Sequence, residues 1–273
     1  MAESRFLVPI QRGVAGKPPL FLVAGGWGGE IEFLVYGQIG RHLGEDQPIY
    51  GLKARGAGTA DAPHADVGEM ATDYLREIRA VQPTGPYWIA GECVGGICAH
   101  EMACQLREEG ETVARLILLD TSVPNPDELA DYLASEGEKE SKEEFRPTFG
   151  GRLKHHWKKL SALSLGGKIK YLFKKALGRP TEPPAPPAPH PRGQAAYPPT
   201  LMRHRLRKYP GRVTLLIDEE SQRLYGNLGW ETAAIGTLET HVLPGDHLTY
   251  IREEGAHAAR KLHDLLSQSS KPS

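Results

Sequence analysis

The chain has 273 residues, of which 40% are hydrophobic and 25% are charged. This composition is ordinary for a globular protein, and the length is enough for one domain with a full core. The net charge of -1 gives no reason to expect nucleic acid or a membrane surface as a partner. The sequence has neither a secretory signal nor an apolar run near the roughly 18 residues of a membrane span, so we expect a cytoplasmic protein.

All three cysteines lie close together, at positions 93, 98 and 104. An odd number at this spacing argues against a disulfide framework and fits a reducing compartment. No C-x-x-C pair or histidine cluster accompanies them, so we expect no metal site.

Short apolar segments alternate with amphipathic ones along most of the chain. We expect strands at 20–24, 49–52, 86–90, 116–119, 213–217 and 238–243, and helices at 67–82, 97–106 and 252–266. Continuous apolar strands that alternate with helices indicate an α/β fold, in which helices cover both faces of a mostly parallel sheet.

The alternation breaks between about 125 and 205. Residues 127–178 are charged and lysine-rich, with helix-like pieces near 127–136 and 151–177, and residues 180–199 contain nine prolines. Such a proline-rich segment favours extended structure over a packed element. We therefore interpret 1–273 as a single domain whose sheet is interrupted by an insertion at about 125–205.

Residues 91–96 read Gly-Glu-Cys-Val-Gly-Gly and lie between an expected strand and an expected helix. A strand, a sharp turn and a helix form the nucleophile elbow of the α/β-hydrolases, whose pattern is G-x-S-x-G. Cys93 occupies the nucleophile position, and the glycines around it allow the helix and the strand to approach closely. For Cys98 and Cys104 we expect only a packing role.

His247 is the expected base, because it lies in the loop after the last strand, where open α/β sheets place their chemistry. A buried carboxylate must orient it. Asp120, at the end of the strand 116–119, is our first candidate. Asp218, at the end of 213–217, is the second, and Asp246 is the third. The chain order of nucleophile, acid and histidine fits the hydrolase pattern.

Stabilising a developing oxyanion requires two backbone N–H groups. We expect one from Val94, directly after the nucleophile. The other should come from the glycine-rich loop after the strand 20–24, at Gly26 or Trp27.

Five motifs together resemble the thioesterase domains of nonribosomal peptide and polyketide synthases. They are Gly-Lys-Pro-Pro-Leu-Phe-Leu-Val, Gly-Glu-Cys-Val-Gly-Gly, Leu-Leu-Asp-Thr-Ser-Val-Pro, Tyr-Pro-Gly-Arg-Val-Thr-Leu and Pro-Gly-Asp-His-Leu. The resemblance covers about residues 6–124 and 200–268 and implies an α/β-hydrolase fold with the insertion as a helical lid. Most members carry serine in place of Cys93, and many carry histidine in place of Ala24.

The resemblance implies that Cys93, activated by His247 and Asp120, takes an acyl or peptidyl chain from the phosphopantetheine thioester of a carrier protein. No cofactor is implied beyond that arm, and the carrier protein is the expected partner. Release would follow by water, or by an amine or hydroxyl of the chain itself.

A native cysteine would keep the intermediate a thioester, and we hypothesise that it supports aminolysis or cyclisation. A cysteine introduced to trap an intermediate, and simple hydrolysis, are alternatives. So are an acyltransferase that uses a separate amine or alcohol, a stand-alone editing thioesterase, and a binding module with an inert Cys93.

Overall fold

We describe residues 4–25, 30–56, 62–124, 204–247, 249–251 and 255–268 of a computed structural model. They belong to one compact unit, which is made of Met1–Leu129 and Gly193–Ser273. The expected lid at about 125–205, with its proline-rich part, falls almost entirely outside the described residues. The lid and the single-domain interpretation therefore stay predictions.

The described residues form a seven-stranded sheet with the order β1-β3-β2-β4-β5-β6-β7. The strands are β1 (Leu7–Gln11), β2 (Leu20–Val23), β3 (Ile49–Leu52), β4 (Tyr87–Glu92), β5 (Val113–Leu119), β6 (Arg212–Asp218) and β7 (Thr237–Leu243). All neighbouring pairs are parallel except β1 and β3, which pair antiparallel at one edge. The predicted mostly parallel sheet is therefore confirmed.

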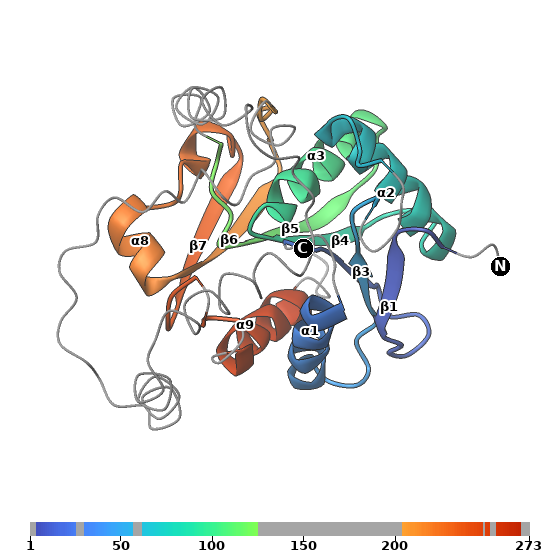
Figure 1. The fold of residues 1–273 in the computed structure, drawn as a ribbon, viewed down its shortest axis with the longest axis horizontal. Helices are drawn as coiled ribbons and strands as arrows, with labels where there is room; N and C mark the ends of the chain where they lie inside the picture. Colours follow the sequence, from blue (N-terminus) through green and yellow to red (C-terminus); the bar gives the residue numbers. More distant parts are fainter. Residues whose placement is uncertain are drawn as a thin grey trace, which may run out of the picture. The chain divides into compact units, whose positions relative to one another are not determined.

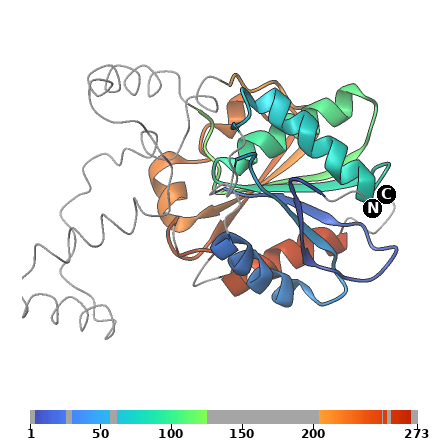
Figure 2. The same cartoon turned by 45° about the vertical axis from the view of Figure 1, so that its right-hand side comes forward.

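Helices cover both faces of this sheet (Figure 1). They are α1 (Glu30–Leu43), α2 (Val67–Val81), α3 (Gly95–Glu108), the short α8 (Glu219–Tyr225) and α9 (Gly255–Gln268), with a 3-10 turn η1 (Trp230–Thr232). Figure 2 shows α2 and α3 on one face and α1 and α9 on the other. Among the helices of the described residues, none has the length and apolar character needed to cross a membrane.

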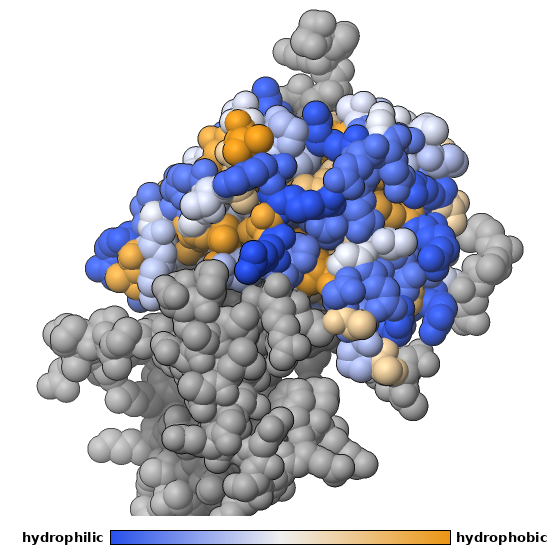
Figure 3. Space-filling view, turned by 90° about the horizontal axis from the view of Figure 1, so that it is seen from above, coloured by the Kyte–Doolittle hydropathy of each residue, from blue (hydrophilic) through white to orange (hydrophobic). Residues whose placement is uncertain are grey.

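The sheet buries side chains on both faces, because alternate residues of a strand point to opposite sides. In β4, Tyr87 and Ile89 join the core under α2 and α3, whereas Trp88 and Ala90 join the core under α1 and α9. Seen from the α2 and α3 side, the described surface is mostly hydrophilic, with smaller hydrophobic areas between (Figure 3). The strands thus act as a rigid frame whose carboxyl ends carry the loops described next.

Candidate active site

The turn between β4 and α3 holds Cys93 in the left-handed region, with a φ of 48°. A non-glycine residue persists there only when its surroundings fix it. The Cys93 N–H donates to the carbonyl of Leu119 at 2.8 Å, and its carbonyl accepts from the N–H of Gly96 at 3.2 Å. The turn therefore presents the half-buried thiol at the carboxyl end of the central strand.

The glycines around Cys93 allow backbone contacts that a side chain would block. A Cβ atom added at Gly91 would lie 2.5 Å from the carbonyl oxygen of Gly95. One added at Gly95 would lie 2.5 Å from the carbonyl oxygen of Val23. At Gly96 it would lie 2.0 Å from Oγ1 of Thr121. The start of α3 therefore packs directly on β2 and β4, as the elbow requires.

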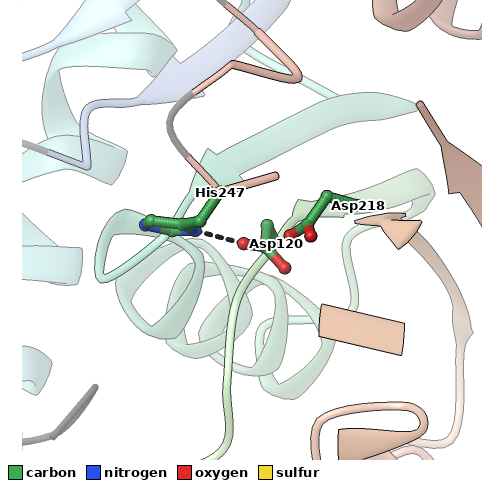
Figure 4. Close-up of side chains that lie close together, drawn as sticks. All are labelled: Asp120, Asp218 and His247. Carbon is green, nitrogen blue, oxygen red and sulfur yellow. Dashed lines mark hydrogen bonds and ion pairs between the residues drawn. The ribbon is translucent and has the colours of Figure 1, made fainter. Parts of the chain in front are cut away.

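His247 and Asp120 meet at the carboxyl edge of the sheet (Figure 4). Asp120 follows β5, its side chain is 1% exposed, and its Oδ2 accepts a hydrogen bond from Nδ1 of His247. An ionised carboxylate only accepts hydrogen bonds, so Nδ1 carries the proton. His247 also has a side-chain hydrogen bond with Cys93. Nε2 is the ring nitrogen left for that contact.

The charge state of His247 follows from these neighbours. Burial favours the neutral ring, but the hydrogen bonds with Asp120 and Cys93, and the attraction of both groups, favour the imidazolium. The net effect raises the pKa of His247 to about 10. Cysteine attacks as the thiolate, and a positive charge beside the sulfur is matched to that form of the nucleophile during the reaction. The site is therefore suited to a thiolate–imidazolium pair.

The two other candidate acids have different contacts. Asp218 ends β6 and caps α8 by accepting the Ser221 N–H at 2.8 Å. It lies beside Asp120, on the side away from His247 (Figure 4). Asp246 accepts the N–H of Thr249 at 3.0 Å and so closes its own turn. The contact with Nδ1 of His247 favours Asp120.

The expected oxyanion donors are described only in part. Val94 is the N-cap residue of α3. The first N–H groups of a helix lack intrahelical acceptors and attract negative charge, which suits the role expected of Val94. Gly26 and Trp27 lie outside the described residues. All three assignments stay predictions.

Tyr36 is a part of this region that the sequence did not indicate. Its side chain is buried, and its hydroxyl lies 2.7 Å from the Glu32 carboxylate and 2.5 Å from that of Glu92. The same hydroxyl accepts the N–H of Gly25 at 3.3 Å. Tyr36 thus connects the residue before Cys93 with the start of the loop after β2. No sequence motif marks this tyrosine.

A second cysteine–histidine pair lies inside α3 and has the opposite character. Sγ of Cys104 is 3.8 Å from Nε2 of His100, and both residues are buried. Burial raises the pKa of the Cys104 thiol to about 11 and lowers that of His100 to about 4. Both groups are neutral at pH 7, so this pair serves packing. Cys98 is also buried, and burial raises its pKa well above the usual value.

An elbow on the central strand of a mostly parallel sheet, with an acid and a histidine later in the chain, is the arrangement of the α/β-hydrolases. Solved thioesterase domains share this fold with the chain. Within that class, the chain belongs to the thioesterase domain family, whose model matches residues 18–266.

The relatives found by sequence are much longer proteins. The chain is 42% identical over 123 residues to the dimodular nonribosomal peptide synthase of Bacillus subtilis (strain 168). This match covers 44% of this chain and 5% of that protein. It is 36% identical over 115 residues to the polyketide synthase PksR of the same organism. That match covers 42% of this chain and 4% of PksR. The matched region is thus a small part of either relative.

Two solved structures show the extent of the structural likeness. The NocB thioesterase domain from the Nocardicin cluster has a TM-score of 0.63 at 23% identity, covering 96% of this chain and 99% of that one. A four-domain nonribosomal peptide synthetase bound to AMP and glycine has a TM-score of 0.63 at 22% identity, covering 98% of this chain and 20% of that one. At these identities the likeness shows the fold.

Proposed function

We propose that this domain releases an acyl, peptidyl or polyketide chain from the phosphopantetheine thioester of a carrier protein, through an acyl-Cys93 intermediate. The observation that carries the proposal is the chain of contacts from Cys93 to His247 to Asp120 at the elbow. The substrate class is supported by the relatives, which include nonribosomal peptide and polyketide synthases.

Acylation starts from the thiolate–imidazolium pair. The Cys93 sulfur attacks the thioester carbonyl carbon, and the N–H of Val94 with that of Gly26 or Trp27 binds the resulting oxyanion. The carbon–sulfur bond to pantetheine then breaks, and His247 donates its Nε2 proton to the departing thiolate. One thioester forms as another breaks, so the step is nearly isoenergetic.

Release of the chain uses the now neutral His247 as a base. It takes a proton from water, or from an amine or hydroxyl of the chain, as that group attacks the acyl carbon. The Cys93 thiolate leaves, and Asp120 holds the imidazolium that has formed. No resident cofactor takes part in either step. A thioester retains more driving force than an ester for making an amide or a strained ring, so we propose aminolysis or cyclisation as the release step.

A synthetic acyl-pantetheine thioester with an internal amine tests this proposal. The domain should form an acyl-enzyme and release the cyclic amide, and Cys93→Ala should abolish both. Cys93→Ser should shift the products toward the linear acid. Undiminished release by Cys93→Ala would overturn the triad. Transfer only to an added amine would indicate an acyltransferase, and binding without turnover a binding module.

A further inference from the structure

The carboxylate that contacts His247 belongs to a cluster of three buried side chains with oxygen atoms. They are Asp120, Asp218 and Ser221, with exposures of 3%, 0% and 0%. The Ser221 hydroxyl oxygen lies 3.4 Å from Oδ2 of Asp120 and makes a closer hydrogen bond with Oδ2 of Asp218. The carboxyl group of Asp120 is also close enough to Asp218 to disfavour its ionisation. A carboxylate oxygen of each and a ring nitrogen of His247 all lie within 4.8 Å of one another.

The number of protons limits how these contacts can be made. The Ser221 hydroxyl has one proton and can donate it to only one carboxyl group. Two ionised carboxylates have no proton of their own to donate to each other or to the Ser221 oxygen. Two buried like charges this close also repel each other strongly, and one of the two groups then stays neutral. One carboxyl group must therefore hold an additional proton.

The neighbours decide which carboxyl group holds it. Asp120 faces the Nδ1–H of His247, and this donor favours the ionised form of Asp120. Within the described part of the chain, no cationic side chain is recorded against Asp218. Its complete burial and the nearby Asp120 charge disfavour ionisation, and they outweigh the Ser221 contacts, so the pKa of Asp218 is raised. Tyr250 packs near the same group, and burial raises its pKa well above 10, so it stays neutral.

We propose that Asp218 is a positioning residue whose carboxyl group is protonated. Its O–H donates a hydrogen bond within the Asp218–Ser221–Asp120 cluster. This neutral acid keeps Oδ2 of Asp120 directed at Nδ1 of His247. The cluster then carries a single negative charge, which matches the single positive charge of the imidazolium. The inference rests on the proposed function, in which Asp120 and His247 serve Cys93.

Two substitutions of Asp218 and one control test the inference. Asp218→Asn retains a donor and an acceptor without a charge, whereas Asp218→Ala removes both. Glu219→Gln, at the exposed neighbouring position, is the matched control. Asp218→Ala should lower the single-turnover acylation rate by roughly tenfold, the loss expected for one hydrogen bond to a charged group. Asp218→Asn should recover most of that loss.

Two spectroscopic readouts separate positioning from simple packing. Nuclear magnetic resonance titration should find the pKa of His247 in Asp218→Asn within about 0.5 of the wild-type value, because no charge is lost. The infrared band of a protonated buried carboxyl group should appear at pH 7 in the wild type and in Glu219→Gln, and should vanish in Asp218→Asn.

A fall of about 1 or more in the pKa of His247 would show that Asp218 is ionised and would overturn the inference. So would the absence of an Asp218-dependent acid band, or a wild-type rate in Asp218→Ala. Failure of the proposed function is a separate outcome. It would appear as a wild-type domain that forms no acyl-Cys93, while the infrared band still reports on Asp218.

Discussion

Replacing Asp120 by asparagine tests how His247 is oriented. The Asp120 side chain is 1% exposed and accepts the Nδ1 proton, which leaves Nε2 free to exchange a proton with sulfur. The asparagine amide can donate a hydrogen bond and so favours the other tautomer, with its proton on Nε2. In that tautomer His247 cannot accept the thiol proton. Loss of the Asp120 charge also lowers the pKa of His247 from about 10, which weakens the thiolate–imidazolium pair.

The size of the effect follows from the chemistry of the nucleophile. In a serine triad the same change costs about 10⁴-fold in rate. A thiol loses its proton more readily than a hydroxyl, so we expect a loss of about 10³-fold, or about 4 kcal/mol at about 1.36 kcal/mol per tenfold. The assay is single-turnover acylation by an acyl-pantetheine thioester, quenched in acid and read by intact-protein mass spectrometry.

The control for this experiment is Asp246→Asn, which changes the carboxylate next to His247 in sequence but should leave acylation near the wild-type rate. The opposite result would be an Asp120→Asn variant that acylates within about tenfold of the wild-type rate, together with an Asp218→Asn variant that loses about 10³-fold. In that case Asp218 would be the acid partner of His247.

Three further outcomes are expected. Gly96→Ala places a Cβ atom 2.0 Å from Oγ1 of buried Thr121. The free energy of unfolding, measured with denaturant, should therefore fall by about 1–3 kcal/mol. A wild-type free energy of unfolding would contradict this packing. Tyr36→Phe removes a buried hydroxyl that contacts two carboxylates and the Gly25 N–H, and it should lower the free energy of unfolding by about 1–3 kcal/mol in the same measurement. A change under about 0.5 kcal/mol would count against these contacts. Cys93→Ser should lower the pKa of His247, measured by nuclear magnetic resonance, because the sulfur helps to raise it; an unchanged pKa would place the sulfur away from the ring. The pKa of His247 is raised from 6.5 to about 10, so protonated His247 stabilises the folded state fully below about pH 6.5. This stabilisation is lost as the pH rises through about 10. In Cys93→Ser it should be lost at a lower pH.

The sequence predicted the elements whose patterns are strongly periodic or continuously apolar. The helix predicted at 67–82 is α2 at Val67–Val81, with Asp66 as its cap, and the strand predicted at 49–52 is β3. The last helix, predicted at 252–266, is α9 at Gly255–Gln268; residues 252–254 are outside the described part. The helix after the elbow begins at Gly95 rather than at 97, because its first two residues are glycines, which give no apolar helical pattern.

The sequence did not predict β1, α1 or α8. β1 is an edge strand that contains Pro9, a residue that weakens any strand prediction. α1 contains Gly37 and Gly40, which lower its helix propensity. At Gly40 a Cβ atom would lie 3.0 Å from Oε1 of Gln11, so packing against β1 explains a small residue there. Such a requirement is set by the tertiary contact and leaves no local pattern.

The site was predictable where a local motif defines geometry. The elbow glycines mark the turn that holds Cys93, and the loop after the last strand marks His247. The relation between Asp120 and Asp218 was not predictable, because both residues end apolar strands in the same way. Only the pairing of β5 with β6 brings the two carboxyl groups together, and only the contact with Nδ1 distinguishes their roles. Tyr36 was missed for a similar reason, since two of its partners, Gly25 and Glu92, lie outside its own helix.

The central claim is that Cys93 carries the chain during release. The most direct measurement is peptide mapping by mass spectrometry after acid quenching of the domain with an acyl-pantetheine thioester. We predict one acyl group per domain, on the peptide that contains Cys93, with no label on Cys98 or Cys104. Cys93→Ala should be unlabelled and inactive. An acyl group on another residue, or product release by Cys93→Ala at the wild-type rate, would contradict the account.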